Sequence, residues 1–124
     1  MAKGARGVMT SGIPEQRTPG FWNNVSQCCG SAGIASFFLD LHKIMREPSY
    51  LAFSKRGTAD LVYRATGDDS GTRWVQAEHR VRPDLLIAQT GYMQGAAGIG
   101  MWLLQLNAFE QGRDVTIRFV DSPF

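Results

Sequence analysis

The sequence predicts a mainly α-helical protein, and three observations support this prediction. Apolar side chains recur at three- and four-residue steps within residues 31–45 and 94–110, which is the spacing of an amphipathic helix. The segment GSAGI at 30–34 returns 65 residues later as GAAGI at 95–99. Each copy runs from small residues into an apolar helix, and such a repeat favours a helical array over a lone domain.

The chain begins with residues 1–24, which are rich in Gly, Pro, Thr and Asn and predict an extended approach segment. Residues 25–124 are then expected to form the helical repeats. Asn24 and Ser26 are side chains of the capping type just before the first helix, which is expected at 31–45.

Pro48 ends the first helix, and a second helix is expected at about 49–65. Both helices carry an apolar face. The side chains expected to be buried on these faces are Ile34, Phe37, Phe38, Leu41, Ile44, Met45, Tyr50, Phe53, Leu61 and Val62.

Turn and strand residues follow the second helix. The composition TGDDSG predicts a turn at 66–71, a short strand follows at 72–77, and residues 78–84 read as a loop. Residues 85–88 are apolar and are expected to pack beneath the start of the last helix.

The last long helix is expected at 94–110, and Gly112 is its predicted stop signal. Its inward side chains are predicted to be Ile99, Trp102, Leu103, Leu106 and Phe109. Polar and apolar residues alternate over 114–120, which predicts a short C-terminal strand.

The composition is that of an ordinary globular protein, with 44% hydrophobic residues, 19% charged residues and a net charge of +2. Its basic residues are scattered, which argues against nucleic-acid binding. No apolar signal segment and no run long enough to span a membrane is present, and two adjacent cysteines do not make a secreted disulfide framework. We therefore expect a cytoplasmic protein with reduced thiols.

The adjacent cysteines Cys28 and Cys29 stand where a loop turns into the first helix. Unpaired amide groups and the helix dipole at such a position favour a thiolate, and soft thiolates are natural zinc ligands. Two thiols are only half of a zinc site. The residues alone therefore leave three interpretations open: packing residues, metal ligands, and a redox or nucleophilic thiol pair.

Other candidates have simpler interpretations. His42 lies thirteen residues after Cys29 on the same helix, about 20 Å along its axis, and cannot join the same metal. His79 falls in a loop that could reach the thiols, although a surface position is the simpler reading. The pair Asp68-Asp69 sits in a turn sequence, and the glycines of 95–100 suit close helix packing better than phosphate binding.

The glycine-rich helix starts and the cysteine pair, together with the segments PGFWNN at 19–24 and GYMQGAAGIG at 91–100, resemble the C-terminal part of lanthionine synthetase C-like proteins. The resemblance runs from about residue 13 to 124. It implies a part of an α/α toroid of paired helices, with the glycine motifs at the starts of inner helices. It also implies zinc, which in the family's cyclases activates a peptide cysteine thiol. That thiol adds to dehydroalanine or dehydrobutyrine and forms a thioether ring.

Carried over residue by residue, the resemblance makes Cys28 and Cys29 zinc ligands, with Cys29 standing where the family's Cys-His-Gly motif has histidine. The family's other ligand cysteine and its catalytic histidine and aspartate lie on earlier repeats, for which this sequence shows no counterpart. We therefore expect a C-terminal fragment that is inactive alone. A peptide substrate, or another chain that completes the toroid, is the expected partner.

Two alternatives to an enzyme fragment also follow from these features. The chain could be a non-catalytic remnant or interaction module, because a toroid cut open exposes apolar flanks. It could also be a relative that binds a small thiol such as glutathione.

Overall fold

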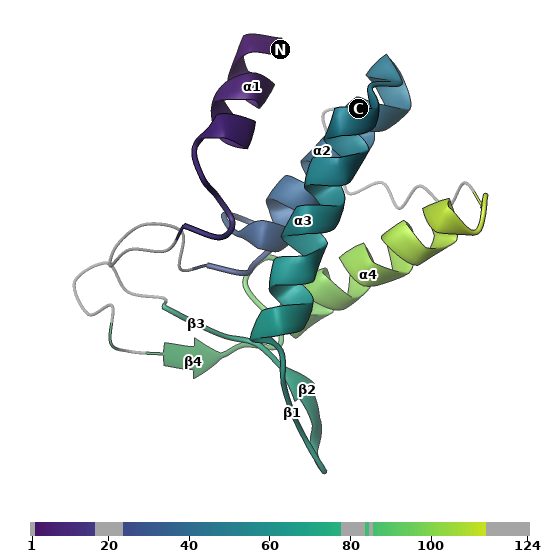
Figure 1. Cartoon of the computed structure of the whole chain (residues 1–124). Coiled ribbons are helices and arrows are strands. Elements are labelled where there is room, and N and C mark those ends of the chain that lie inside the picture. Colours follow the sequence, from purple (N-terminus) through teal and green to yellow (C-terminus); the bar gives the residue numbers. More distant parts are fainter. Residues whose placement is uncertain (1, 17–23, 78–83, 85, 114–124) are drawn as a thin grey trace.

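The computed structural model describes residues 2–16, 24–77, 84 and 86–113 of the chain (Figure 1). This part is mainly helical, as the sequence predicts. Its elements in order are α1 (Ala2–Thr10), α2 (Ser31–Met45), α3 (Pro48–Arg64), β1 (Thr66–Asp68), β2 (Gly71–Arg73), β3 (Val75–Ala77), β4 (Leu86–Ala88) and α4 (Ala96–Glu110).

Helices α2 and α3 form an antiparallel pair, and their predicted bounds are confirmed to within one residue. Arg46 ends α2 in the left-handed region at φ 56°. Pro48 stands at the first position of α3, where its missing N–H costs nothing, and the Glu47 side chain accepts a hydrogen bond from Ser49 N at 3.4 Å. Gly57 lets α3 lie close to α2, because a Cβ there would come within 3.1 Å of Ala35 Cβ.

Two clusters of buried side chains form the core. The lower cluster joins α2, α3 and α4, and the upper cluster joins α1 to the α2–α3 pair. The lower cluster contains Val25, Ala32, Ala35, Leu39, Leu61, Trp74, Ile99, Trp102 and Leu106. The upper cluster contains Ala5, Ile13, Phe38, Leu41, Tyr50 and Phe53. Of the predicted inward side chains of α4, Leu103 and Phe109 are partly buried against the lower cluster.

Some apolar residues predicted to be buried are exposed instead. Phe37, Ile44 and Met45 on α2 are 41%, 56% and 45% exposed, and Val62 on α3 is 65% exposed. The apolar residues of these helices form a wider face than the neighbouring described helices cover. The residues at the edges of that face are therefore exposed.

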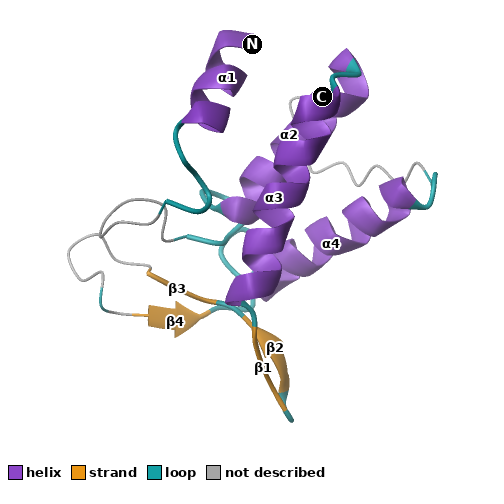
Figure 2. Cartoon of the chain, in the orientation of Figure 1, coloured by secondary structure: helices purple, strands orange, loops and turns teal. Residues whose placement is uncertain are grey.

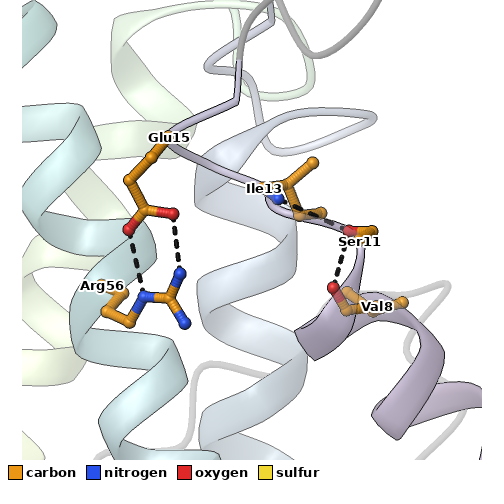
Figure 3. Close-up of polar contacts among 5 residues, drawn as sticks. All are labelled: Val8, Ser11, Ile13, Glu15 and Arg56. Atoms are coloured by element: carbon orange, nitrogen blue, oxygen red, sulfur yellow. Dashed lines mark hydrogen bonds and ion pairs between the residues drawn. The ribbon is translucent and has the colours of Figure 1, made fainter.

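The N-terminal segment contains a helix, so the prediction of an extended segment over 1–24 was wrong for residues 2–10. Three apolar residues at helical spacing, Ala5, Val8 and Met9, pack into or against the upper cluster. This burial outweighs the low helix propensity of the two glycines in the helix. The segment after α1 is fixed to α3 by a bidentate ion pair between Glu15 and Arg56, with contacts of 2.7 and 3.0 Å (Figure 3).

Two short antiparallel strand pairs lie at the end of the molecule opposite α1 (Figure 2). Strands β1 and β2 pair with Thr66 opposite Arg73. The predicted turn at 66–71 is therefore confirmed only at residues 69–70, which form the tip of a hairpin, because residues 66–68 are strand β1 and Gly71 begins β2. The single strand predicted at 72–77 is divided between β2 and β3 at Trp74, whose buried indole donates to Leu61 O at 2.8 Å.

Strand β4 pairs with β3, with Val75 opposite Ala88. The apolar residues of this strand were expected beneath the last helix, but Leu86 and Ile87 are 59% and 42% exposed, so that expectation was wrong. The loop predicted at 78–84 lies outside the described residues except for Asp84, and the strand predicted at 114–120 lies wholly outside them. None of the described helices is long and apolar enough to cross a membrane.

The predicted 65-residue repeat is present in the backbone. Gly30 precedes α2 with φ −134° and ψ −163°, and Gly95 precedes α4 with φ −135° and ψ −162°. Because Gly95 is the N-cap, α4 begins two residues later than the sequence predicts. Gly112, the predicted stop signal, adopts a positive φ of 69° after α4.

The loops before the two helices share the same hydrogen bonds. The N–H of Ser31 donates to Asn24 O at 3.3 Å, and the equivalent N–H of Ala96 donates to Gln89 O at 2.9 Å. Gly33 and Gly98 make the same close approach to their loops. A Cβ would lie 2.2 Å from Gln27 O in the first copy and 1.9 Å from Tyr92 O in the second.

The two repeat helices run in the same direction, side by side. Their starts are joined by a hydrogen bond from Cys28 N to Met93 O at 2.9 Å, between equivalent positions of the two loops. Near their ends, the rings of His42 and Phe109 meet edge to face with centroids 6.0 Å apart. The internal repeat therefore places two equivalent helix starts next to each other.

Because a fixed backbone carbonyl cannot yield to a methyl group, we expect Gly33→Ala and Gly98→Ala each to lower the free energy of unfolding by about 3 kcal/mol. The matched control is Gly100→Ala on α4, where a Cβ would meet nothing within 4 Å. That substitution should instead stabilise the helix by about 0.5–1 kcal/mol. Urea unfolding followed by circular dichroism measures all three, and a stable Gly33→Ala protein would contradict the close approach.

Candidate site at the paired thiols

The thiols of Cys28 and Cys29 lie side by side in the loop just before α2, and both residues are exposed. Exposure removes the interpretation of the pair as packing residues, because neither side chain fills a core. The main-chain N–H of Cys28 donates to Met93 O, so the backbone of this residue is held in place while its side chain is exposed to solvent.

The two sulfurs influence each other directly. The charge of a Cys29 thiolate raises the pKa of the Cys28 thiol above its usual value, and a side-chain hydrogen bond with Cys29 raises it further. Two thiolates this close repel each other. A cation held between them would remove this repulsion, which is the electrostatic situation of a thiolate metal site.

Polar side chains of the same loop surround the Cys29 sulfur. Asn24 Nδ2 donates to Cys29 Sγ at 3.2 Å, while Asn24 Oδ1 accepts from Ser26 N at 2.8 Å. Ser26 is fully buried, and its Oγ lies 3.8 Å from Cys29 Sγ. Asn24 and Ser26 were predicted to cap the first helix, but the N-cap is Gly30 and receives no side-chain cap. Their polar groups serve the loop and the sulfur.

Helix α3 contacts this loop through Arg64, and it contacts the first residue of α2 through Asp60. Arg64 Nη1 reaches Asn24 O at 3.5 Å and also pairs with Asp60 at 3.5 Å. Ser31, the first residue of α2, donates to Asp60 Oδ2 at 2.5 Å, and Asp60 is only 5% exposed. The sequence analysis missed Asp60 and Arg64. Their four-residue spacing on a helix was the available signal, but nothing in it identifies a buried pair.

The other predicted candidates do not join the thiols in the described part of the chain. His42 lies near the end of α2, where its Nδ1 is 2.9 Å from Glu47 O, so its predicted place near the helix C-terminus is confirmed. His79 lies outside the described residues. Asp68 accepts hydrogen bonds from Ser70 and Arg73 across the β1–β2 turn, and these bonds lower its pKa to about 2.

The thiol pair fits part of a zinc ligand set. A zinc ion takes three or four protein ligands, and thiolates are among the best of them. Within residues 2–16, 24–77, 84 and 86–113, no group of three or more His, Cys, Asp or Glu side chains is arranged to hold a metal ion. A zinc ion bound to the two sulfurs would therefore need a further ligand from outside these ranges or from another chain.

The residue before the pair carries a buried acceptor, Gln27 Oε1, without a hydrogen-bond partner among the described residues. A buried acceptor of this kind usually has a partner. The loop around the thiols can therefore accept one more donor group than the described chain provides.

A separate hollow of about 430 Å³ lies between the segment after α1 and the outer face of α3. Its charged lining residues are all paired: Glu15 and Arg56 with each other, and Asp60 with Arg64 and Ser31.

Comparison with known proteins agrees with the resemblance drawn from the sequence. A family model described as lanthionine synthetase C-like protein matches residues 15–117, which is most of the chain. No curated protein and no solved structure matched.

Because the Cys29 charge is the main cause of the raised Cys28 pKa, we expect Cys29→Ala to lower that pKa. In metal-free protein, the rate of Cys28 alkylation by iodoacetamide should then rise at a lower pH than in a protein with both thiols. The variant Cys29→Ser keeps a hydroxyl without the charge and should show most of the same decrease. An unchanged Cys28 pKa in both variants would show that the sulfurs do not interact, and a higher one would show that Cys29 favours the Cys28 thiolate.

Proposed function

We propose, from the premise that the chain belongs to the lanthionine synthetase C-like family, that Cys28 and Cys29 are two ligands of a zinc ion in a thioether-forming enzyme. The observation that carries the proposal is the placement of two exposed, interacting thiols at the start of an apolar helix. The helix dipole at such a start favours negative charge on the sulfurs, and a bound cation would offset the repulsion between them.

When bound, zinc would supply the activation of a peptide cysteine thiol for addition to dehydroalanine or dehydrobutyrine. Cys28 and Cys29 would hold the metal through their two sulfurs. With Cys29 in the place of the family's histidine, the pair would give the metal two thiolate charges, which would favour the nucleophilicity of a substrate thiol there. The remaining ligand and the acid–base groups would come from outside the described residues or from another chain.

We also propose that α2 and α4 are inner helices of an α/α toroid, α2 and α3 forming one of its helix pairs. Two features support this arrangement: the equivalent starts of α2 and α4, and their parallel course. The exposed apolar side chains Phe37, Ile44 and Met45 on α2 and Leu104 on α4 would be covered by neighbouring repeats or by another chain. A peptide with dehydrated residues would be the substrate.

The first experiment measures zinc per chain in reduced protein together with the solution mass. We expect zinc to bind to the unchanged chain, and Cys28→Ala and Cys29→Ala each to weaken zinc affinity more than about 100-fold. Residues that only contact a metal ligand change metal affinity by about 10–100-fold, and loss of a ligand itself should cost more. His42→Ala is the matched control, because His42 lies near the far end of α2 and should leave affinity unchanged.

The stoichiometry decides where the missing ligand comes from. One zinc per monomer indicates a ligand within this chain, and His79→Ala is then the next variant. One zinc per two chains indicates a bridging site with four thiolates. Equal zinc affinity in Cys28→Ala, Cys29→Ala and the unchanged chain would refute the assignment.

Thioether formation is tested separately, by incubating the zinc-loaded chain with a peptide that carries a cysteine and a dehydroalanine. Ring closure adds no mass, so the readout is loss of the free thiol to alkylation. Zinc binding without ring closure would keep the metal site and remove the cyclase activity from the proposal.

A further inference from the structure

The two sulfurs of the pair have different surroundings. The Cys29 sulfur receives the Asn24 amide at 3.2 Å and has the Ser26 hydroxyl at 3.8 Å. Among the described residues, the side chain that bonds to the Cys28 sulfur is the Cys29 thiol. An amide donor and a hydroxyl therefore lie against the Cys29 sulfur, whereas the bonding partner of the Cys28 sulfur is Cys29 itself.

The hydrogen-bond network orients both donors. Asn24 Oδ1 accepts from Ser26 N at 2.8 Å, which turns the amide so that its NH₂ group faces the sulfur. Ser26 Oγ accepts from Cys29 N at 3.4 Å. When Cys29 is a thiolate it has no proton to give, so the Ser26 hydroxyl is the donor between these two atoms.

The second copy of the loop serves as an internal control for what the fold requires. Gln89 and Gly91 stand at the positions of Asn24 and Ser26, and Gln94 stands at the position of Cys29. The second loop nevertheless has the same N-cap geometry and the same backbone hydrogen bonds. The backbone of this loop therefore forms without a hydroxyl at the Ser26 position and without asparagine at the Asn24 position. These two polar side chains occur in the copy that has the thiols.

We propose that Asn24, assisted by Ser26, is a positioning residue for the Cys29 sulfur, and that it holds this sulfur as the anchored ligand while Cys28 remains the open one. The Asn24 carbonyl is itself fixed by Ser31 N at 3.3 Å and by Arg64 at 3.5 Å. The inference rests on the proposed zinc site only where it concerns metal. The contact with the sulfur exists without metal.

The first test uses metal-free, folded protein and one equivalent of iodoacetamide, in the alkaline range where the labelling rate no longer rises with pH, so that the raised pKa of Cys28 does not decide the distribution of label. Fragment-ion mass spectrometry then gives the share of label on each cysteine. We expect Cys28 to take most of the label in the unchanged chain. Asn24→Ser keeps an oxygen that can accept from Ser26 N but cannot reach the sulfur. It should raise the Cys29 share several-fold.

Gln89→Ser is the matched control, because it makes a comparable change at the equivalent position of the loop that has no thiol. It should leave the distribution of label unchanged. Ser26→Ala removes the hydroxyl beside the Cys29 sulfur and serves as the second variant if Asn24→Ser does not fold. It should also shift label towards Cys29. An unchanged distribution in the donor variants, or the same shift in Gln89→Ser, would overturn the inference.

The second test uses cobalt as a spectroscopic substitute for zinc. Loss of a hydrogen bond raises the energy of the sulfur lone pairs, so Asn24→Ser should move the sulfur-to-cobalt charge-transfer band to longer wavelength and weaken metal binding about 10–100-fold. A band unmoved by the substitution would overturn the inference for the metal-bound state. If the unchanged chain binds no metal but the alkylation shift occurs, the zinc proposal fails and the role of Asn24 stands.

Discussion

The close contact between each repeat helix and its own loop is the constraint on which the rest of this structure depends. At Gly33 and Gly98 the helix backbone lies so near a loop carbonyl that a Cβ would be 2.2 or 1.9 Å from the oxygen. This contact folds each loop back under its helix start. It also sets the direction in which the loop side chains leave the backbone, and so it brings the thiols to the surface.

The same constraint explains how one scaffold carries two different surfaces. Both copies share their N-cap dihedral angles and their loop hydrogen bonds, so the backbone geometry depends on the glycines and small residues that they have in common. Side chains at the remaining positions are then free to differ. One copy presents Cys28 and Cys29, and the other presents Met93 and Gln94. The reactive groups lie on a framework that the other copy forms without them.

Sequence reasoning succeeded where local periodicity and backbone chemistry decide the structure. It predicted α2 and α3 closely, the repeat, and the position of the thiols, because prolines, glycines and helical spacing act over a few residues. It failed where tertiary contacts decide. The helix at 2–10 depends on burial of Ala5, and the donors around Cys29 depend on a loop conformation that no residue type specifies alone. The pairing of Asp60 with Ser31 joins positions 29 residues apart and left no local pattern.

Cys28 combines two kinds of behaviour within one residue. Its amide proton is held by Met93 O, in the contact that joins the two repeats, whereas its side chain is exposed. The amide is therefore part of the hydrogen-bonded junction between the repeats, and the sulfur is open to solvent and reagents. A ligand that bound at the sulfur would be attached, through a single residue, to the junction between two repeats. The hydrogen bond from Cys28 N to Met93 O would then connect the bound ligand directly to the loop of the second repeat.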